Sequence, residues 1–279
     1  MSATLASREF DFTDADFERV RKLIYTQAGI SLSPAKRDMV YSRLARRLRA
    51  RGDTSFGQYL RRLEAGDGTE WESFVNALTT NLTSFFRESH HFDILGQWVR
   101  QMKERRPVRI WSSACSTGEE AYSIAMCMCE VFDTLTPPVQ IIASDLDTNV
   151  LAKAQSGVYE EERVEKLSRE RLQRFFLRGT GANAGQVRVR PELTRLIAFH
   201  QVNLLHERWP VQGPLDIIFC RNVMIYFDKP TQYQILKKFA PLLRPEGRLF
   251  AGHSESFAHA ADLFHSLGRT VYERADKSR

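Results

Sequence analysis

Short apolar runs alternate with segments of helical spacing from residue 108 toward the C-terminus. The runs have the length of buried strands and lie at residues 108–112, 139–143, 196–202, 215–220 and 248–252. The helical segments begin at residues 119 and 148, and a further one covers 231–243. Strands that alternate with helices form a mostly parallel sheet with helices on both faces. This alternation predicts an α/β fold.

The first hundred residues show helical spacing only. We expect helices at residues 13–29, 33–52, 55–66, 69–82 and 91–105. Thr13 with Asp16, and Thr69 with Glu72, have the spacing of capping boxes, and Gly52 is a typical helix end. The sequence therefore predicts an N-terminal all-helical domain.

We place the domain boundary in the charged segment 103–107, so that the helical domain covers residues 1–104 and the α/β domain 105–279. Glycines interrupt the second domain at about residues 174–199. Gly179, Gly181 and Gly185 lie there between two short apolar segments. Such a pattern predicts a small antiparallel β insertion.

Basic residues are concentrated in one part of the helical domain. Nine basic and two acidic residues lie between positions 36 and 62, whereas the formal charge of the whole chain is +6. Arg43, Arg46 and Arg47 lie on one face of the expected second helix. This concentration indicates an acidic partner, which nucleic acid, an anionic membrane or an acidic protein surface could each provide. A merely solvated basic face is the alternative.

Several classes of protein do not fit the sequence. No apolar run approaches the about 18 residues of a membrane helix, and Arg8, Glu9 and Asp11 occupy the place of a signal peptide's apolar core. Four cysteines are too few for a disulfide framework. We therefore expect a cytoplasmic protein that is not inserted into a membrane. Because adjacent His90 and His91 point apart on a helix, we expect no metal site.

Two features at the carboxyl ends of the expected strands indicate a cofactor. A loop of small residues, 114–118, follows the first strand, and Asp145 ends the second. The loop has one glycine, Gly118, where a dinucleotide fold has three, whereas a carboxylate such as Asp145 can accept both ribose hydroxyls. A nucleoside cofactor without a diphosphate fits, and S-adenosylmethionine is one. The alternative is that Asp145 caps a helix, a role that Asp147 could also fill.

Several blocks of sequence resemble the bacterial chemotaxis receptor methyltransferases of the CheR family. They are Phe85-Phe-Arg-Glu88 within 77–92, Ser116-Thr-Gly-Glu-Glu120 within 111–120, 143–147, Cys220-Arg-Asn-Val223 within 218–228, and 251–255. The resemblance implies a Rossmann-like class I methyltransferase domain. It also implies methyl transfer from S-adenosylmethionine to glutamate side chains of membrane chemoreceptors, with S-adenosylhomocysteine as the other product.

The resemblance also implies roles for individual residues. Those that would bind the cofactor are Asn81, Thr83, Arg87, Gly118, Glu120, Asp145, Asn203, Leu204, Arg221 and Asn222. Arg87 and Tyr226 would be catalytic, with a surface ion pair and a core position as their alternatives. Arg43, Arg46 and Arg47 would face the receptor. Arg188 and Arg190 of the insertion would meet the carboxylates of a C-terminal receptor pentapeptide that pairs with an exposed edge strand. A hairpin that merely covers the edge of the large sheet is the alternative.

The physical chemistry of the implied reaction is simple. A glutamate is ionised at neutral pH and needs no general base, so alignment and exclusion of water would supply the catalysis. Two other functions remain open at this point. A basic helical domain beside a cofactor domain also suits a nucleic-acid methyltransferase, although no Asn-Pro-Pro-Tyr or Pro-Cys segment occurs. The second open function is that of a non-catalytic interaction module with the same fold. We expect the protein to be a monomer.

Overall fold

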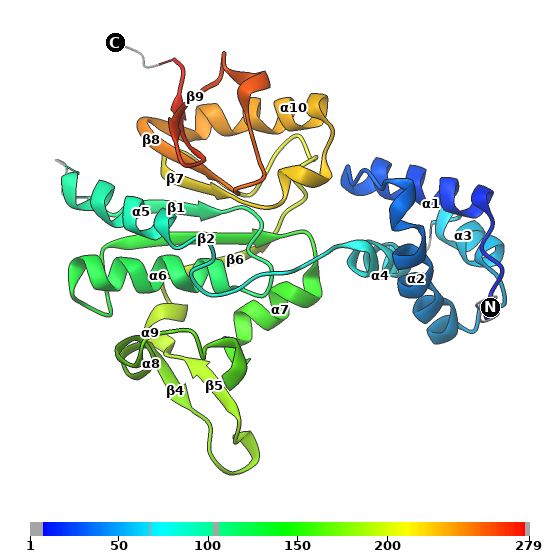
Figure 1. The fold of residues 1–279 in the computed structure, drawn as a ribbon, viewed down its shortest axis with the longest axis horizontal. Coiled ribbons are helices and arrows are strands. Elements are labelled where there is room, and N and C mark those ends of the chain that lie inside the picture. Colours follow the sequence, from blue (N-terminus) through cyan, green and yellow to red (C-terminus); the bar gives the residue numbers. More distant parts are fainter. Residues whose placement is uncertain (1–7, 67, 103–105, 277–279) are drawn as a thin grey trace, which may run out of the picture. The chain divides into compact units, whose positions relative to one another are not determined.

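The computed structural model describes residues 8–66, 68–102 and 106–276, and the chain divides into two compact units (Figure 1). The units are Met1–Thr80 and Asn81–Arg279. The division therefore precedes the boundary expected at residue 104, because α5 (His90–Gln101) packs within the second unit. The Cys127 thiol of α6 (Glu119–Phe132) donates to the Phe92 carbonyl of α5 at 3.4 Å. Residues 103–105 of the expected linker lie outside the described residues.

The first unit is helical. Its elements are α1 (Asp14–Ala28), η1 (Pro34–Lys36), α2 (Arg37–Arg51), α3 (Phe56–Glu64) and α4 (Gly68–Leu78). Thr13 and Asp16 form the predicted capping box at the start of α1, and Gly52 ends α2 in the left-handed conformation. The helices share a core in which Val20, Leu44 and Phe74 are fully buried.

Helix α4 differs from the prediction at both ends. It begins at Gly68, so Thr69 lies within the helix and is not its N-cap. It ends at Leu78 instead of residue 82, and the Thr79 hydroxyl donates back to the Asn76 carbonyl at 2.9 Å. β-Branched Thr79 and Thr80 are weak helix formers whose hydroxyls compete for backbone carbonyls. The early end leaves Asn81 outside the helix.

The basic residues of α2 are mostly engaged within the helical unit. Arg47 makes two hydrogen bonds to the Glu70 carboxylate, at 3.1 and 2.7 Å, and Glu70 is only 3% exposed. Arg43 donates to the carbonyls of Ala77 and Thr79 at the end of α4. Arg46 is exposed and forms no ion pair with the described residues. Of the three arginines expected to form one docking surface, Arg43 and Arg47 therefore bind within the helical unit, and only Arg46 is exposed to solvent.

We predict that Arg47→Met lowers the free energy of unfolding by about 1–2 kcal/mol. The buried Glu70 carboxylate loses its bidentate partner but retains Arg51 at 3.3 Å and the Tyr59 hydroxyl at 2.8 Å. Arg46→Met is the matched control on the same helix and should change the free energy of unfolding by less than about 0.5 kcal/mol. Urea unfolding followed by circular dichroism measures both. Equal effects of the two variants would contradict the structural role of Arg47.

The second unit contains a seven-stranded sheet of order β6-β2-β1-β7-β8-β10-β9. Its strands are β1 (Val108–Ser112), β2 (Val139–Asp145), β6 (Ile197–Gln201), β7 (Leu215–Cys220), β8 (Leu243–Ala251), β9 (Phe264–Gly268) and β10 (Val271–Arg274). The neighbours from β6 to β8 are parallel, as predicted. The antiparallel strands β10 and β9, which the alternation of strands and helices did not indicate, extend the sheet beyond β8.

Helices cover both faces of this sheet (Figure 1). They are α6 (Glu119–Phe132), α7 (Thr148–Ser156) and α10 (Lys229–Phe239), with short helices η4 (Met224–Tyr226), η5 (Ala240–Leu242) and η6 (Ala258–Ala260). One core packs α5 and α6 against side chains such as Ile110, and the other packs α10 against side chains such as Trp111. Alternate residues of β1 therefore enter opposite cores.

The insertion is a three-stranded sheet of order β3-β5-β4. Its strands are β3 (Val158–Glu160), β4 (Phe176–Arg178) and β5 (Gln186–Val189), and the connections contain η2 (Glu161–Arg163), α8 (Arg169–Phe175), η3 (Gly181–Asn183) and α9 (Pro191–Thr194). The insertion thus begins at Val158, earlier than expected, and residues 197–199 belong to the large sheet.

The strand order corrects the expected edge strand. Arg188 pairs with Val158 on one side and with Leu177 on the other, so β5 is the central strand. Arg190 follows β5, and its backbone N–H donates to the Phe175 carbonyl at 2.9 Å. The open edges of the small sheet are β3 and β4.

No helix among the described residues is both long and apolar enough to span a bilayer.

Candidate functional site

Most candidate site residues of the second unit lie on loops at the carboxyl ends of β1, β2, β6 and β7 and on the segment 81–89. Backbone hydrogen bonds join the loop after β1 to the neighbouring strands. The Ser113 N–H donates to the Phe219 carbonyl of β7 at 2.9 Å, and the Cys115 N–H donates to the Ser144 carbonyl of β2 at 2.8 Å. Ligands of open parallel sheets bind at this edge, where the strand order reverses. In this sheet β1 lies between β2 and β7, so the reversal occurs at β1.

Asp145 and Asp147 have separate roles. Asp147 is the N-cap of α7 and accepts hydrogen bonds from the N–H groups of Asn149 and Val150. Asp145 instead accepts from the Ser116 N–H at 2.8 Å and from the Asp147 N–H at 3.0 Å. The alternative that Asp145 caps the helix is therefore wrong. Its carboxylate joins the loops after β1 and β2 and retains acceptor capacity for a ligand.

Asp145 is 9% exposed, and this burial raises the pKa of its carboxyl group to about 6. The N–H groups of Asp147 and Ser116 oppose that shift. The pKa is therefore closer to neutrality than that of an ordinary aspartate, and the charge of this side chain changes in the mildly acidic range.

Gly118 is required by close packing. Its φ is +97°, and a Cβ there would lie 2.9 Å from both the Ala154 Cβ and the Tyr159 hydroxyl. The start of α6 consequently lies directly against α7 and β3. This contact accounts for the single glycine that the sequence analysis found in the loop.

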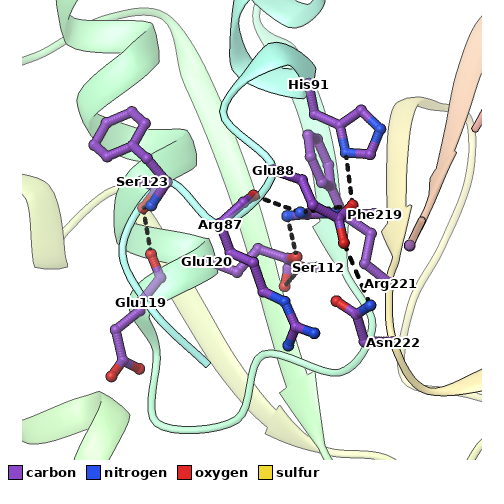
Figure 2. A network of polar contacts seen from close by, with 12 residues as sticks. Arg87, Glu88, His91, Ser112, Glu119, Glu120, Ser123, Phe219, Arg221 and Asn222 are labelled. Carbon is purple, nitrogen blue, oxygen red and sulfur yellow. Dashed lines mark hydrogen bonds and ion pairs between the residues drawn. The ribbon is translucent and has the colours of Figure 1, made fainter. Parts of the chain in front are cut away.

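A buried arginine forms the centre of a polar network (Figure 2). The Arg221 side chain is 2% exposed and lies 3.1 Å from the Glu88 carboxylate and 3.0 Å from that of Glu120. It also donates to the Arg87 carbonyl. The Ser112 hydroxyl completes the set by donating to Glu120 at 2.7 Å. One guanidinium thus joins the segment 81–89, the start of α6 and the loop after β7.

The two carboxylates differ in their titration. Burial raises the pKa of Glu120 above its ordinary value, and the Arg221 guanidinium opposes the shift. For Glu88, burial also acts to raise the pKa, but Arg221 and the His253 N–H outweigh it, so the pKa lies below the ordinary value. Glu88 is therefore ionised at neutral pH.

Glu88 also contacts residues outside the ion pair. Its carboxylate accepts from the Asn222 side-chain amide at 3.4 Å and from the His253 N–H at 3.3 Å. The His91 Nδ1 lies 3.6 Å away. Burial and the nearby Arg221 lower the pKa of His91 to about 4, so the ring is neutral. Its Nε2 lies 3.0 Å from the Arg269 carbonyl, which gives His91 a structural role, as expected.

Arg87 lies on a backbone of unusual conformation. Its neighbours Phe86 and Glu88 have φ values of +51° and +56°. The Arg87 guanidinium donates to the Leu82 carbonyl at 2.8 Å and forms no ion pair with any described residue. Non-glycine residues in the left-handed region persist where surrounding contacts hold them, and they cluster at functional sites. The alternative of a surface pair with Glu88 or Asp93 is not found.

The other residues of the expected site are distributed along the same loops. The Asn81 amide donates to Asp147 at 2.8 Å, and the Thr83 carbonyl accepts from Arg163 at 3.0 Å. The Asn203 side chain accepts the Leu205 N–H at 2.9 Å, and the adjacent Leu204 is buried.

Asn222 and Tyr226 follow β7. Asn222 has a φ of +59°, and its N–H donates to the Glu255 carboxylate at 2.9 Å. Tyr226 is half-buried at the end of η4. Glu255 also accepts the N–H groups of Gly252 and Met224 and thereby fixes the loop.

The roles of Glu88 and Glu255 were not predicted from the sequence. Both residues occur in blocks that resemble the family, Phe85-Phe-Arg-Glu88 and 251–255, so a carboxylate beside an assigned arginine or loop was the available signal. Glu119, which is fully buried and forms an ion pair with Arg163, was not predicted either. Arg43, Arg46 and Arg47 lie on α2, and Arg188 and Arg190 lie on β5 and just after it, so none of these five residues belongs to the loops described above.

We predict that Arg221→Met lowers the free energy of unfolding by about 3–5 kcal/mol at pH 8, because two buried carboxylates lose their common cation. Without it, the pKa of Glu88 rises above its unfolded value, and that of Glu120, which is already raised, rises further. The folded state then binds more protons than the unfolded state, so the variant becomes more stable as pH falls from 8 to 5. Urea unfolding at both pH values measures this.

A double variant, Arg221→Met with Glu120→Gln, serves as the control for the preceding prediction. It removes one of the two uncompensated charges and should recover part of the loss at pH 8. A loss that is the same at pH 5 and pH 8 would show that packing of the arginine, and not its charge, stabilises the loops.

Two known families of domain match this chain. The CheR methyltransferase all-alpha domain matches residues 15–79, and the CheR methyltransferase SAM binding domain matches residues 81–273. The chain is 54% identical over 275 residues to chemotaxis protein methyltransferase 2 of Pseudomonas aeruginosa, with 98% of each protein covered. It is 52% identical over 261 residues to the chemotaxis protein methyltransferase of Escherichia coli K12, covering 93% of this chain and 91% of that protein.

Proposed function

Because this chain belongs to the CheR methyltransferase family, it is an S-adenosylmethionine-dependent methyltransferase of chemotaxis, and we propose that its acceptor is a glutamate side chain of a chemoreceptor. The observation that most supports this acceptor is the state of Arg87. Its guanidinium has no carboxylate partner in the described part of the chain, and the residues on both sides of Arg87 have positive φ values. An anionic side chain is the natural ligand of such a group.

In the proposed reaction, S-adenosylmethionine supplies a methyl group bonded to a cationic sulfur. A glutamate oxygen forms the new O–CH3 bond as the S–CH3 bond breaks, and the charges of the carboxylate and the sulfonium disappear together. Arg87 and the Tyr226 hydroxyl hold the carboxylate in line, and no residue has to remove a proton. The products are a glutamate methyl ester and S-adenosylhomocysteine.

We assign the cofactor to the segment 81–87 and to the loops at the carboxyl ends of β1, β2, β6 and β7. Asp145 would accept hydrogen bonds from the ribose hydroxyls. Glu120 would accept hydrogen bonds from the amino group of the methionine part, since Arg221 favours the ionised form of Glu120. The remaining residues assigned to this site are Asn81, Thr83, Arg87, Gly118, Asn203, Leu204, Arg221 and Asn222. The fit of a ribose rests on Asp145. Its carboxylate accepts the N–H groups of Ser116 and Asp147 and interacts with that of Leu146, whereas a carboxylate has about four acceptor positions.

We predict that the affinity for S-adenosylhomocysteine falls as pH decreases from 7.5 to 5.5, because protonation of Asp145, with its pKa of about 6, removes acceptor capacity from the ribose site. Asp145→Asn should weaken binding at pH 7.5 by about 1–3 kcal/mol and abolish the dependence on pH over this range. Isothermal titration calorimetry measures both. A variant that retains the pH dependence would assign it to another group.

The acceptor class has a direct chemical test. Tritiated S-adenosylmethionine and membranes that contain chemoreceptors should give a labelled receptor whose label is released as volatile methanol in alkali, because a carboxyl ester is base-labile. Label that alkali does not release would indicate an amide, amine or nucleic-acid acceptor and would contradict the proposal.

We propose that the exposed part of the α2 basic face binds acidic receptor helices and not nucleic acid. Arg43 and Arg47 are committed to α4, and Arg49 pairs with Glu9, so little of the positive charge of this unit is left for phosphates. Arg46 is the exposed member of the three arginines first assigned to the receptor.

We predict that Arg46→Glu raises the Michaelis constant for the receptor about tenfold and leaves cofactor affinity unchanged, because it places like charges in contact with the acidic partner. Arg61→Glu on α3 makes the same change in net charge at an exposed position of the same unit. Initial rates of methylation over a range of receptor concentrations distinguish the two. Equal effects would mean that only overall charge matters.

A C-terminal receptor pentapeptide remains part of the proposal, with a corrected place. Since β5 is central, the peptide would add to the edge strand β4 or β3. Arg188 lies opposite Leu177 of β4 and is exposed, so it remains a candidate for a peptide carboxylate, whereas Arg190 lies beyond the strand. We propose that the enzyme acts as a monomer in the cytoplasm, in keeping with free thiols at Cys115, Cys127, Cys129 and Cys220.

A further inference from the structure

We propose that Tyr159 and Arg163, which belong to the small-sheet insertion, are positioning residues for the cofactor site. The inference rests on the proposed assignment of the cofactor to the segments 81–87 and 115–120. Tyr159 lies on β3 and Arg163 ends η2. Neither is among the residues assigned above to the cofactor, and each binds one or both of the segments that are.

Tyr159 contacts the loop after β1 directly. Its hydroxyl donates to the Thr117 carbonyl at 2.7 Å, and the side chain is 1% exposed. Gly118 lies so close to this hydroxyl that a Cβ would be 2.9 Å from it. Since the loop turns at Ser116 and Gly118 through positive φ values, the hydrogen bond fixes it between two unusual backbone positions.

Arg163 joins two segments that are far apart in the sequence. Its guanidinium donates to the Thr83 carbonyl at 3.0 Å and forms an ion pair with the buried Glu119 carboxylate. The Thr117 hydroxyl donates to the same carboxylate at 2.6 Å. One side chain of the insertion therefore links the segment 81–87 to the loop before α6.

An aromatic contact strengthens the connection. Phe85, two residues before Arg87, packs edge-on against Tyr159 of β3 at 5.0 Å and against Phe176 of β4 at 5.6 Å between ring centroids. It is 9% exposed. The small sheet thus holds the segment that bears Arg87 through apolar packing as well as through Arg163.

These contacts make the small sheet part of the scaffold of the cofactor site. A cofactor that binds the ordered loops should in turn stabilise β3, because coupling between two sites is reciprocal. If the insertion were an independent docking module, its inner contacts would not affect cofactor binding. Measurements of cofactor binding to the whole chain distinguish a scaffold role of the small sheet from a docking role.

The first test compares two tyrosines. Tyr159→Phe removes a buried hydroxyl that donates to the Thr117 carbonyl at 2.7 Å, and Tyr122→Phe removes one that donates to the Ala154 carbonyl of α7 at 2.8 Å. Both variants lose a hydrogen bond of similar length. We expect the dissociation constant of S-adenosylhomocysteine to rise about fivefold in Tyr159→Phe and less than about twofold in Tyr122→Phe. Equal constants would overturn the role of Tyr159.

The second test compares two arginines of the insertion. Arg163→Gln should raise the Michaelis constant for S-adenosylmethionine several-fold and leave kcat at saturating cofactor and the constant for the receptor little changed. Arg178→Gln breaks a surface pair with Glu161, 2.8 Å long, within the insertion and should change none of the three. A fall in kcat alone, or the same effect in both variants, would contradict positioning of the cofactor loops.

Amide hydrogen exchange separates positioning from loss of stability. S-adenosylhomocysteine should slow exchange at residues 158–163 of the unmodified protein, and this protection should be lost in Tyr159→Phe at saturating ligand. Absence of protection in the unmodified protein would overturn the coupling. If Asp145→Asn leaves cofactor affinity unchanged, the assignment of the site itself fails. If only the Tyr159 and Arg163 variants behave like their controls, this inference alone fails.

Discussion

The buried ion pairs of Arg221 join the parts of the candidate site. Its guanidinium lies between Glu88 and Glu120, which come from segments separated by the whole of β1 and its loop. Burying three charged groups costs free energy that is recovered only where each is paired and hydrogen-bonded. Here the Ser112 hydroxyl and the Asn222 amide occupy further lone pairs of the carboxylates. The cluster therefore fixes the positions of these segments relative to one another. Displacement of any one segment would leave an unpaired charge in an apolar interior.

The same loops contain backbone conformations that sequence preference alone would not select. Phe86, Glu88, Ser116 and Asn222 all have positive φ values, although none is glycine. Each is held by a contact made outside its own turn: the Phe86 N–H donates to Ser123, Ser116 to Asp145, and Asn222 to Glu255, while Glu88 is paired with Arg221. Such strain persists where the surroundings determine the conformation. These contacts thus keep Arg87 and the loops at the strand ends in place before a ligand arrives.

Much of this arrangement could be predicted from the sequence, and the failures have physical causes. The strands 108–112 and 215–220 were predicted to the residue, because buried parallel strands are unbroken apolar runs. Strand β3 was missed, since three residues are too few to show a period. The boundary at Thr80 was missed because α5 has the amphipathic pattern of a helix in either unit, and only its contacts with α6 decide between them. The loops of the site were predicted because they follow the carboxyl ends of strands. The pairing of Glu88 with Arg221 could not be predicted, because the two residues are far apart in the sequence.

The basic segment shows why a charge count along the chain does not measure surface charge. Arg37, Arg47, Arg49 and Arg62 pair with Asp14, Glu70, Glu9 and Asp53, and three of these acids lie outside the segment 36–62 that was counted. The local excess in sequence is therefore largely compensated in space. An exposed arginine between compensated ones presents its charge without competition from neighbouring unpaired cations, which suits recognition of a single acidic side chain better than the continuous binding of a phosphate backbone. On α2, arginines that stabilise the helical unit thus lie next to Arg46, which faces solvent. Which arginines are paired depends on where the rest of the unit places a carboxylate near α2.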